Sequence, residues 1–155
     1  MKKVMFISST GGHLEQLLGL KKTMDSFESY IVTEKDSITT DLRKDYINMK
    51  YLPFFSRQNK LLFPFQFFKV FLKSIILFIQ INPQVIVSTG AGVVIPMFLL
   101  GKIFNKKLIF IESFAKTDSK TITGKICYPF VDVFIVQWEE MLELYPKAKY
   151  FGSIY

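Results

Sequence analysis

Short apolar segments that end in a glycine turn and lead into an apolar helical pattern constrain the fold of this chain more than any other feature. Val4 to Ser8 is a run of strand-forming residues that breaks at Thr10-Gly11-Gly12-His13, after which leucines recur at helical spacing. Gln84 to Ser88 is a near-continuous apolar run, typical of strands buried on both faces of a parallel sheet. It breaks at Thr89-Gly90-Ala91-Gly92, before the apolar helical segment Val93 to Phe104. Strand, turn and helix therefore follow one another twice.

The segments between and after these units continue the alternation. Further strands are expected at Tyr30 to Thr33, Lys50 to Pro53, Lys107 to Glu112, Val131 to Val136 and Lys149 to Gly152. Further helices are expected within Glu34 to Lys44, from Pro64 to Ile81, from Thr121 to Tyr128 and from Trp138 to Tyr145. This order predicts an α/β fold, a Rossmann-like open parallel sheet with helices on both faces. A chain of 155 residues is expected to form one domain, residues 1–155.

Three polar stretches follow strands of the predicted sheet. They are Ser8 to His13, Ser88 to Gly92 and Glu112 to Lys116. Ligands of such sheets bind at the carboxyl ends of the strands, so we expect the three stretches to face one crevice.

The first stretch offers a phosphate site and a candidate base. Gly11 and Gly12 precede a helix, where backbone N–H groups and the helix dipole can hold a phosphate. A tight turn with a surface histidine is the alternative, because the pattern departs from G-x-G-x-x-G and from the P-loop. His13 is the only histidine. If it points into the crevice, it can take a proton from a sugar hydroxyl or bind a phosphate oxygen as a cation.

The second and third stretches supply further crevice candidates. Gly90 and Gly92 flank Ala91 and allow close approach either of a ligand or of a neighbouring helix. Glu112 follows four apolar residues at a strand end, where its carboxylate needs a partner. Sugar hydroxyls and the cap of a neighbouring loop are the two alternatives, and we take Glu112 as a second catalytic candidate. The crevice candidates are Thr89, Gly90, Ala91, Gly92 and Ser113.

The charge and the aromatic content favour an anionic, membrane-associated setting. Twenty Lys and Arg against thirteen Asp and Glu give a net charge of +7, which suits phosphorylated ligands, nucleic acid or an anionic leaflet. Nucleic acid is disfavoured because the lysines are spread over many elements without a recognisable motif. Leu61 to Ile81 has the length of a membrane span, but lysines near the middle of a span are costly, so we expect no transmembrane helix. The segment either packs on the sheet or lies at a bilayer surface. The candidate membrane-facing residues are Phe67, Phe68, Lys69, Phe71 and Lys73.

The remaining composition restricts cofactors and compartment. The first twelve residues, MKKVMFISSTGG, contain too short an apolar run for a signal peptide. A single cysteine, Cys127, excludes an internal disulfide and offers no metal cluster, which favours a reducing compartment. We expect no metal and no other cofactor. A flavin or dinucleotide binder is disfavoured because the fingerprint glycines are absent.

Four ordered blocks together resemble a known family. They are S-S-T-G-G-H-L near the start, S-T-G-A-G-V-V-I-P in the middle, I-E-S-F-A-K after the next strand, and the segment Tyr128 to Gly152. They resemble the bacterial relatives of the fourteenth asparagine-linked glycosylation protein, found in capsule and exopolysaccharide synthesis. The resemblance implies the N-terminal half of a GT-B glycosyltransferase, paired with a separate subunit that binds the nucleotide sugar. The pair would transfer a sugar from a UDP-sugar to a lipid-diphosphate-linked saccharide at the cytoplasmic face of the membrane.

The resemblance also implies site residues. In the related single-chain transferase that builds the peptidoglycan lipid intermediate, the first glycine turn receives the acceptor's diphosphate, which carries over onto Thr10, Gly11, Gly12 and His13. Ile111 stands where that enzyme has a histidine, so the role of that histidine is not implied here. Eukaryotic family members begin with a membrane anchor that this sequence lacks, so peripheral membrane contact is expected.

Two functions remain open. The chain is either the acceptor-binding subunit of a two-component enzyme, or a non-catalytic membrane adaptor that recruits and activates its partner. In both cases an apolar docking surface is expected near Trp138 and the C-terminal segment.

Overall fold

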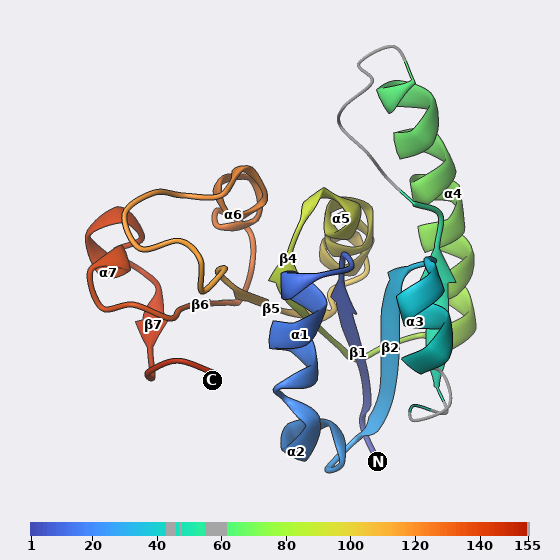
Figure 1. The fold of residues 1–155 in the computed structure, drawn as a ribbon, viewed down its shortest axis with the longest axis horizontal. Coiled ribbons are helices and arrows are strands. Elements are labelled where there is room, and N and C mark those ends of the chain that lie inside the picture. The colour runs from blue at the N-terminus through green and yellow to red at the C-terminus, as the bar shows by residue number, and fades with distance from the viewer. Residues whose placement is uncertain (43–45, 47, 55–61, 155) are drawn as a thin grey trace.

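Within the residues that the computed structural model describes, 1–42, 46, 48–54 and 62–154, seven parallel strands form one sheet (Figure 1). The strands are β1 (Lys3–Ser8), β2 (Glu28–Glu34), β3 (Met49–Leu52), β4 (Val85–Gly90), β5 (Lys107–Ile111), β6 (Val133–Val136) and β7 (Lys149–Tyr150). Their order is β3-β2-β1-β4-β5-β6-β7. The predicted open parallel sheet is therefore confirmed. The chain adds strands outward from β1 in one direction and then from β4 in the other, so the order reverses between β1 and β4.

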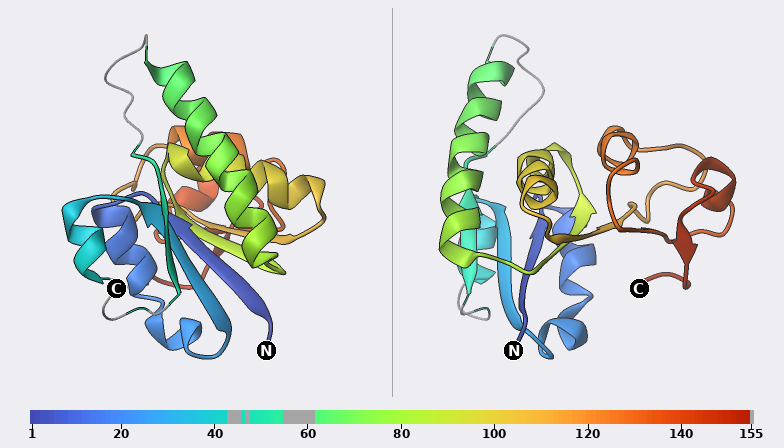
Figure 2. Two further views of the ribbon diagram at one scale, coloured as in Figure 1. Left: turned by 90° about the vertical axis from the view of Figure 1, so that its right-hand side faces the viewer. Right: turned by 180° about the vertical axis from the view of Figure 1, so that it is seen from behind.

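The helices connect these strands and cover both faces of the sheet (Figure 2). They are α1 (Gly12–Leu18), α2 (Lys21–Met24), α3 (Ser37–Leu42), α4 (Phe63–Ile81), the 3₁₀ turn η1 (Gly92–Val94), α5 (Ile95–Ile103), α6 (Ile122–Cys127) and α7 (Met141–Leu144). Two expected helices are divided. The first is divided because Gly19 ends α1 before α2 begins. The second, expected as one helix from Val93, begins with the 3₁₀ turn η1, because Pro96 lies in the first turn of α5 and fixes where that α-helix starts.

Each face of the sheet has its own apolar core. Along β1, Met5 and Ile7 pack into the cluster that contains α4, α5, α6 and α7. Val4 and Phe6 point the other way, into the cluster with α1 and α2. Alternation along a strand sends successive side chains to opposite faces, so a strand buried on both faces must be apolar throughout. This explains the continuous apolar runs in the sequence.

Helix α4 packs on the sheet along one side only. Val70, Leu77, Phe78 and Ile81 are buried in the core, and the turns before Val70 project past the ends of the strands (Figure 1). Of the helices in the described part of the chain, α4 is the one with the length and composition of a membrane span.

Candidate functional site

A pocket of about 500 Å³ lies at the carboxyl edge of the sheet. Ser9 and His13 line it from the turn after β1, Ala91 and Gly92 from the turn after β4, and Lys116 from the loop after β5. Each of the three predicted polar stretches therefore contributes to one pocket. Its position is the point between β1 and β4 where the strand order reverses, which is where open α/β sheets bind ligands.

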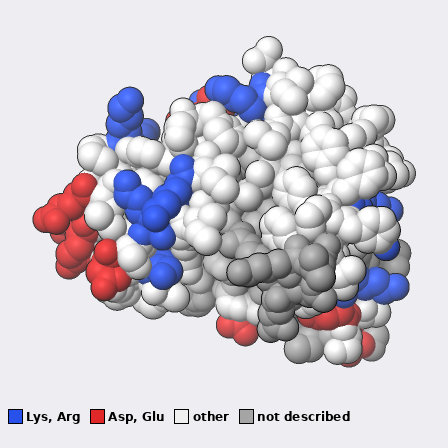
Figure 3. Space-filling view, turned by 90° about the horizontal axis from the view of Figure 1, so that it is seen from above, with Lys and Arg blue, Asp and Glu red and all other residues white. Residues whose placement is uncertain are grey.

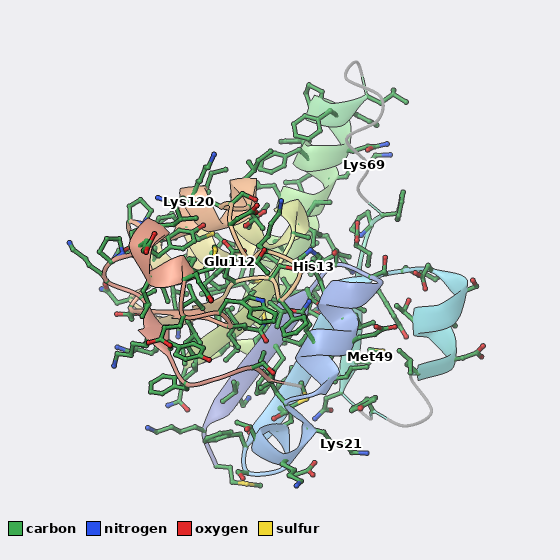
Figure 4. All side chains as sticks on the ribbon, turned by 60° about the vertical axis from the view of Figure 1, so that its left-hand side comes forward. His13, Lys21, Met49, Lys69, Glu112 and Lys120 are labelled. Carbon is green, nitrogen blue, oxygen red and sulfur yellow. The ribbon has the colours of Figure 1, made fainter. Side chains whose placement is uncertain are left out.

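His13 is held in the pocket wall by two hydrogen bonds to Thr89. The His13 Nδ1 atom lies 2.9 Å from the Thr89 carbonyl oxygen, and the Thr89 hydroxyl donates to the His13 carbonyl at 2.6 Å. A carbonyl only accepts, so the neutral ring carries its proton on Nδ1 and leaves Nε2 as a hydrogen-bond acceptor. An imidazole fixed in this tautomer is suited to take a proton through Nε2. Figure 4 shows His13 at the start of α1, above the ends of the strands.

The turn after β4 is shaped around this histidine. Gly90 has φ 116°, and a Cβ atom placed on it would lie 3.2 Å from the His13 ring. The ring of His13, the candidate base, therefore leaves little room for a side chain at position 90. Ala91 has φ 75° and ψ 158°, a conformation that costs a non-glycine residue about 1–3 kcal/mol and that clusters at functional sites. Thr89 is fully buried beneath the turn and positions His13.

The first glycine turn leaves open space beside the pocket. Gly11 has φ 73°, and a Cβ atom on Gly11 or Gly12 would meet nothing within 4 Å. The Thr10 N–H group donates to Glu34 Oε2 at 3.4 Å. Among the described residues, Ser9 and His13 line the pocket from this segment, while Gly11 and Gly12 are exposed next to it.

Glu112 is oriented differently from the sequence-based hypothesis. Its side chain is 1% exposed and, with Ser113, lies outside the described pocket lining. The carboxylate accepts hydrogen bonds from the Ser113 N–H at 2.9 Å, the Thr121 hydroxyl at 2.9 Å and the Tyr145 hydroxyl at 2.7 Å. Buried donors of the protein therefore occupy both carboxylate oxygens of Glu112. Of the two partners considered from the sequence, sugar hydroxyls or a neighbouring loop, these contacts match the loop.

Tyr145 is the buried partner of this carboxylate. Burial and then the hydrogen bond to Glu112 raise the pKa of Tyr145 above its ordinary value of 10.0, so the phenol stays protonated and donates. Gly124 leaves room for this cluster, since a Cβ atom there would collide with the Glu112 carboxylate and lie 2.6 Å from the Tyr145 hydroxyl oxygen. The cluster ties the loop between β5 and α6 to the core.

Three charged pocket residues were not assigned a role from the sequence. Glu34 ends β2, is 3% exposed and lines the pocket. The available signal is the same as for Glu112, an acidic residue where an apolar strand ends, but the sequence predicts the strand only from Tyr30 to Thr33 and assigns Glu34 to the following polar stretch. Lys116 and Lys120 line the pocket from the loop before α6. Lys116 lay inside the third polar stretch, and Lys120 follows it.

The outward face of α4 carries an apolar stripe. The residues of this stripe recur at spacings of three and four, as one helix face requires. They are Phe65, Phe68, Leu72, Ile76 and Ile79, and the most exposed of them is Ile79 at 70%. Of the five predicted membrane-facing residues, Phe68 and Lys69 are exposed, and Phe67, Phe71 and Lys73 are half-buried. Figure 3 views the molecule from above and shows a broad area without charged residues on the side of α4.

Residues 4–154 match the model of a family described as oligosaccharide biosynthesis protein Alg14 like. The chain belongs to this family. It is 30% identical to the UDP-N-acetylglucosamine transferase subunit alg14 of Schizosaccharomyces pombe, over 99% of this chain and 83% of the relative. It is 27% identical to the UDP-N-acetylglucosamine transferase subunit ALG14 of Mus musculus, over 98% of this chain and 82% of the relative.

Solved structures place this family member among GT-B folds. MurG of Acinetobacter baumannii superposes with a TM-score of 0.73 at 17% identity, over 90% of this chain and 43% of MurG. UDP-N-acetylglucosamine 2-epimerase of Rickettsia bellii superposes with a TM-score of 0.73 at 17% identity, over 99% of this chain and 45% of the epimerase. The chain thus spans less than half the length of these structures, and the predicted likeness to one half of a GT-B chain is confirmed.

Proposed function

We propose that this chain is the acceptor-binding, membrane-associating subunit of a two-component glycosyltransferase, and that residues 1–155 act as a single Rossmann-like domain. The pair transfers a sugar from a UDP-sugar to a lipid-diphosphate-linked saccharide. The observation that carries the proposal is the pocket between β1 and β4, with His13 and two lysines in its lining. The names of the Alg14 relatives support N-acetylglucosamine as the donor sugar. The resemblance to bacterial members supports a role in capsule or exopolysaccharide synthesis.

The pocket residues supply the chemistry of the acceptor side. A hydroxyl of the acceptor sugar attacks the anomeric carbon of the donor, the bond from that carbon to the UDP oxygen breaks, and UDP leaves with the bonding electrons. The hydroxyl proton passes to His13 Nε2, which the Nδ1 bond to Thr89 keeps free to accept it. Gly11 and Gly12 leave room for the acceptor's diphosphate at the mouth of the pocket. Glu112 acts through the loop that it anchors, as a positioning residue.

The donor half belongs to a separate subunit. Enzymes with the GT-B fold react between two Rossmann-like halves, and the match to less than half of MurG supports a partner that binds the nucleotide sugar. The partner would close over the carboxyl edge of the sheet, where the pocket opens.

The apolar stripe of α4 supports peripheral contact with the cytoplasmic face of a membrane. Phe65 and Phe68 lie in the first turns of α4 and are exposed, and one end of α4 projects past the strands in Figure 1. On the flank of α4, Lys35, Lys50 and Lys73 line a second groove of about 550 Å³ beside β3. Apolar side chains with lysines at their edge suit the interface of an anionic leaflet.

The non-catalytic adaptor is the second candidate function, and one variant pair separates the two. In His13→Asn the amide nitrogen takes the place of Nδ1 and keeps the Thr89 bond, whereas no atom replaces Nε2. In His13→Gln the amide nitrogen takes the place of Nε2, and the Thr89 bond is lost. Both variants are assayed in complex with the partner, with thermal unfolding as the control for folding.

A catalytic subunit with His13 as the base predicts that His13→Asn keeps its fold and its bound partner and loses transfer by about 10²-fold or more. An adaptor predicts full transfer by both variants while the partner stays bound. Full transfer by His13→Asn would remove His13 as the base.

A further inference from the structure

The loop from Ser113 to Thr121 is fixed at both ends and carries two lysines over the pocket. Near its start, the Phe114 N–H donates to Gln16 Oε1 at 3.1 Å and the Trp138 indole N–H donates to the Phe114 carbonyl at 2.7 Å. At its end, the Thr121 hydroxyl donates to buried Glu112. These contacts therefore set the position of Lys116 and Lys120, which line the pocket together with His13. Figure 4 labels His13, Glu112 and Lys120.

The two ammonium groups keep donors available for a ligand. Lys116 Nζ donates to the Ser119 hydroxyl at 3.3 Å, and Lys120 Nζ lies 4.9 Å from the centre of the Tyr145 ring. Each ammonium has three N–H donors, so neither contact exhausts it. Among the residues that the structure describes, no carboxylate forms an ion pair with Lys116 or Lys120. Glu34, whose carboxylate accepts from the Thr10 N–H, is the acidic residue in the described lining of the same pocket.

We propose that Lys116 and Lys120 bind a diphosphate diester in this pocket, one ammonium to each phosphate. A diphosphate diester carries one negative charge on each phosphate, which matches two ammonium groups. An ammonium group adds the attraction of a full positive charge for phosphate, which a backbone N–H group at the glycine turn lacks, so these lysines provide more binding free energy than that turn. The assignment rests on the proposed function for the identity of the ligand, since both a lipid-linked acceptor and a UDP-sugar are diphosphate diesters. The acceptor is favoured because the pocket lies within this chain.

The test measures each substrate separately in the assembled enzyme. We expect Lys116→Met and Lys120→Met each to raise the KM for the lipid-diphosphate acceptor by about tenfold, the loss of one charge-assisted bond. The KM for the UDP-sugar stays unchanged, and Lys120→Arg, which keeps the charge, recovers most of the affinity. Lys125→Met is the matched control, because Lys125 is exposed on α6 and outside the described pocket lining.

A second measurement uses the chain without its partner. Trp138 is the only tryptophan, and its ring packs against that of Phe114 with the two centroids 4.8 Å apart, so its fluorescence reports on this loop. Titration with inorganic pyrophosphate is expected to give a saturable change in Trp138 fluorescence in the wild type and in Lys125→Met. In the Lys116→Met/Lys120→Met double variant, the affinity for pyrophosphate should be at least tenfold weaker. Equal thermal unfolding of all variants is the control for folding.

The outcomes separate the lysine site from the function. An unchanged acceptor KM in both lysine variants overturns the proposal, and a rise confined to the UDP-sugar KM assigns the lysines to the donor instead. Equal pyrophosphate affinity in the double variant and the wild type also overturns it. Lysine-dependent pyrophosphate binding without any sugar transfer by the wild-type pair leaves the diphosphate site standing and refutes the glycosyltransferase.

Discussion

The buried hydrogen bond from Tyr145 to Glu112 gives the sharpest stability prediction. Tyr145→Phe removes one hydroxyl that donates to the Glu112 carboxylate at 2.7 Å. The ring stays in place, 4.4 Å from the ring of Phe134 and 4.8 Å from that of Tyr128, so little packing is lost. A hydrogen bond to a charged group contributes about 1.5–3 kcal/mol. We therefore expect the free energy of unfolding to fall by about 2 kcal/mol.

Urea unfolding measures this change with two probes. Trp138 fluorescence follows the anchored loop, and far-UV circular dichroism follows the sheet and helices as a whole. The midpoint should fall with an unchanged m-value, because the surface exposed on unfolding is the same. The melting temperature should fall by about 6 °C, since 1 kcal/mol corresponds to about 2–4 °C for a chain of this size.

Tyr128→Phe is the matched control in the same aromatic cluster. Its hydroxyl accepts from the backbone N–H of Lys147 at 2.7 Å, in an exposed position where water can replace it. We expect a loss of less than about 1 kcal/mol for this neutral bond. If Tyr145→Phe costs no more than Tyr128→Phe, the Glu112 carboxylate does not hold the loop, and the positioning role assigned to it is refuted.

Three further predictions concern other parts of the molecule. Ala91→Gly should stabilise the fold by about 1 kcal/mol in thermal unfolding, because glycine removes the strain at φ 75° at some cost in chain entropy; destabilisation would show that Ala91 is unstrained. Burial, reinforced by Glu112, raises the pKa of Cys127 from 9.0 to about 12. The contribution of this shift to the free energy of unfolding is complete below pH 9 and is lost as the pH rises toward 12. Cys127→Ala should therefore flatten the decline of that free energy between pH 9 and about pH 12. The native thiol should also resist disulfide reagents at pH 8, and rapid labelling without unfolding would contradict its burial. Ile79→Glu should change stability by less than about 0.5 kcal/mol, because the side chain is 70% exposed. It should weaken flotation with anionic vesicles, and equal flotation of variant and wild type would remove the α4 stripe from the membrane contact.

The sequence predicted the sheet well because apolar runs and glycine turns are local signals. Val4 to Ser8 lies in β1 and all of Gln84 to Ser88 except Gln84 lies in β4, and the topology then brings their turns together. Side-chain direction is not local. Glu34 is the last residue of β2 and Glu112 directly follows β5, yet Glu34 lines the pocket and Glu112 turns to Tyr145. Tyr145 follows α7 and lies 33 residues further along the chain than Glu112, so no local pattern around Glu112 predicts the contact.

The exposed face of α4 shows the same limit. The sequence predicted the helix, but most of its residues are apolar, so the sequence alone does not decide which side the core covers. The structure buries the side of Val70 and Leu77 and exposes the opposite side with Leu72 and Ile76. Which apolar side meets the sheet depends on the position of β3 and α5, and neither is encoded within α4.

The central claim, that this chain supplies the acceptor half of a split glycosyltransferase, is tested most directly by one rate comparison. Transfer from UDP-N-acetylglucosamine to a lipid-diphosphate-linked saccharide is measured in membranes with this chain alone, with the nucleotide-sugar-binding subunit alone, and with both. We predict transfer by the mixture and little or none by either protein alone. Equal transfer by the partner alone would contradict the account, because no part of the acceptor site would then reside in this chain.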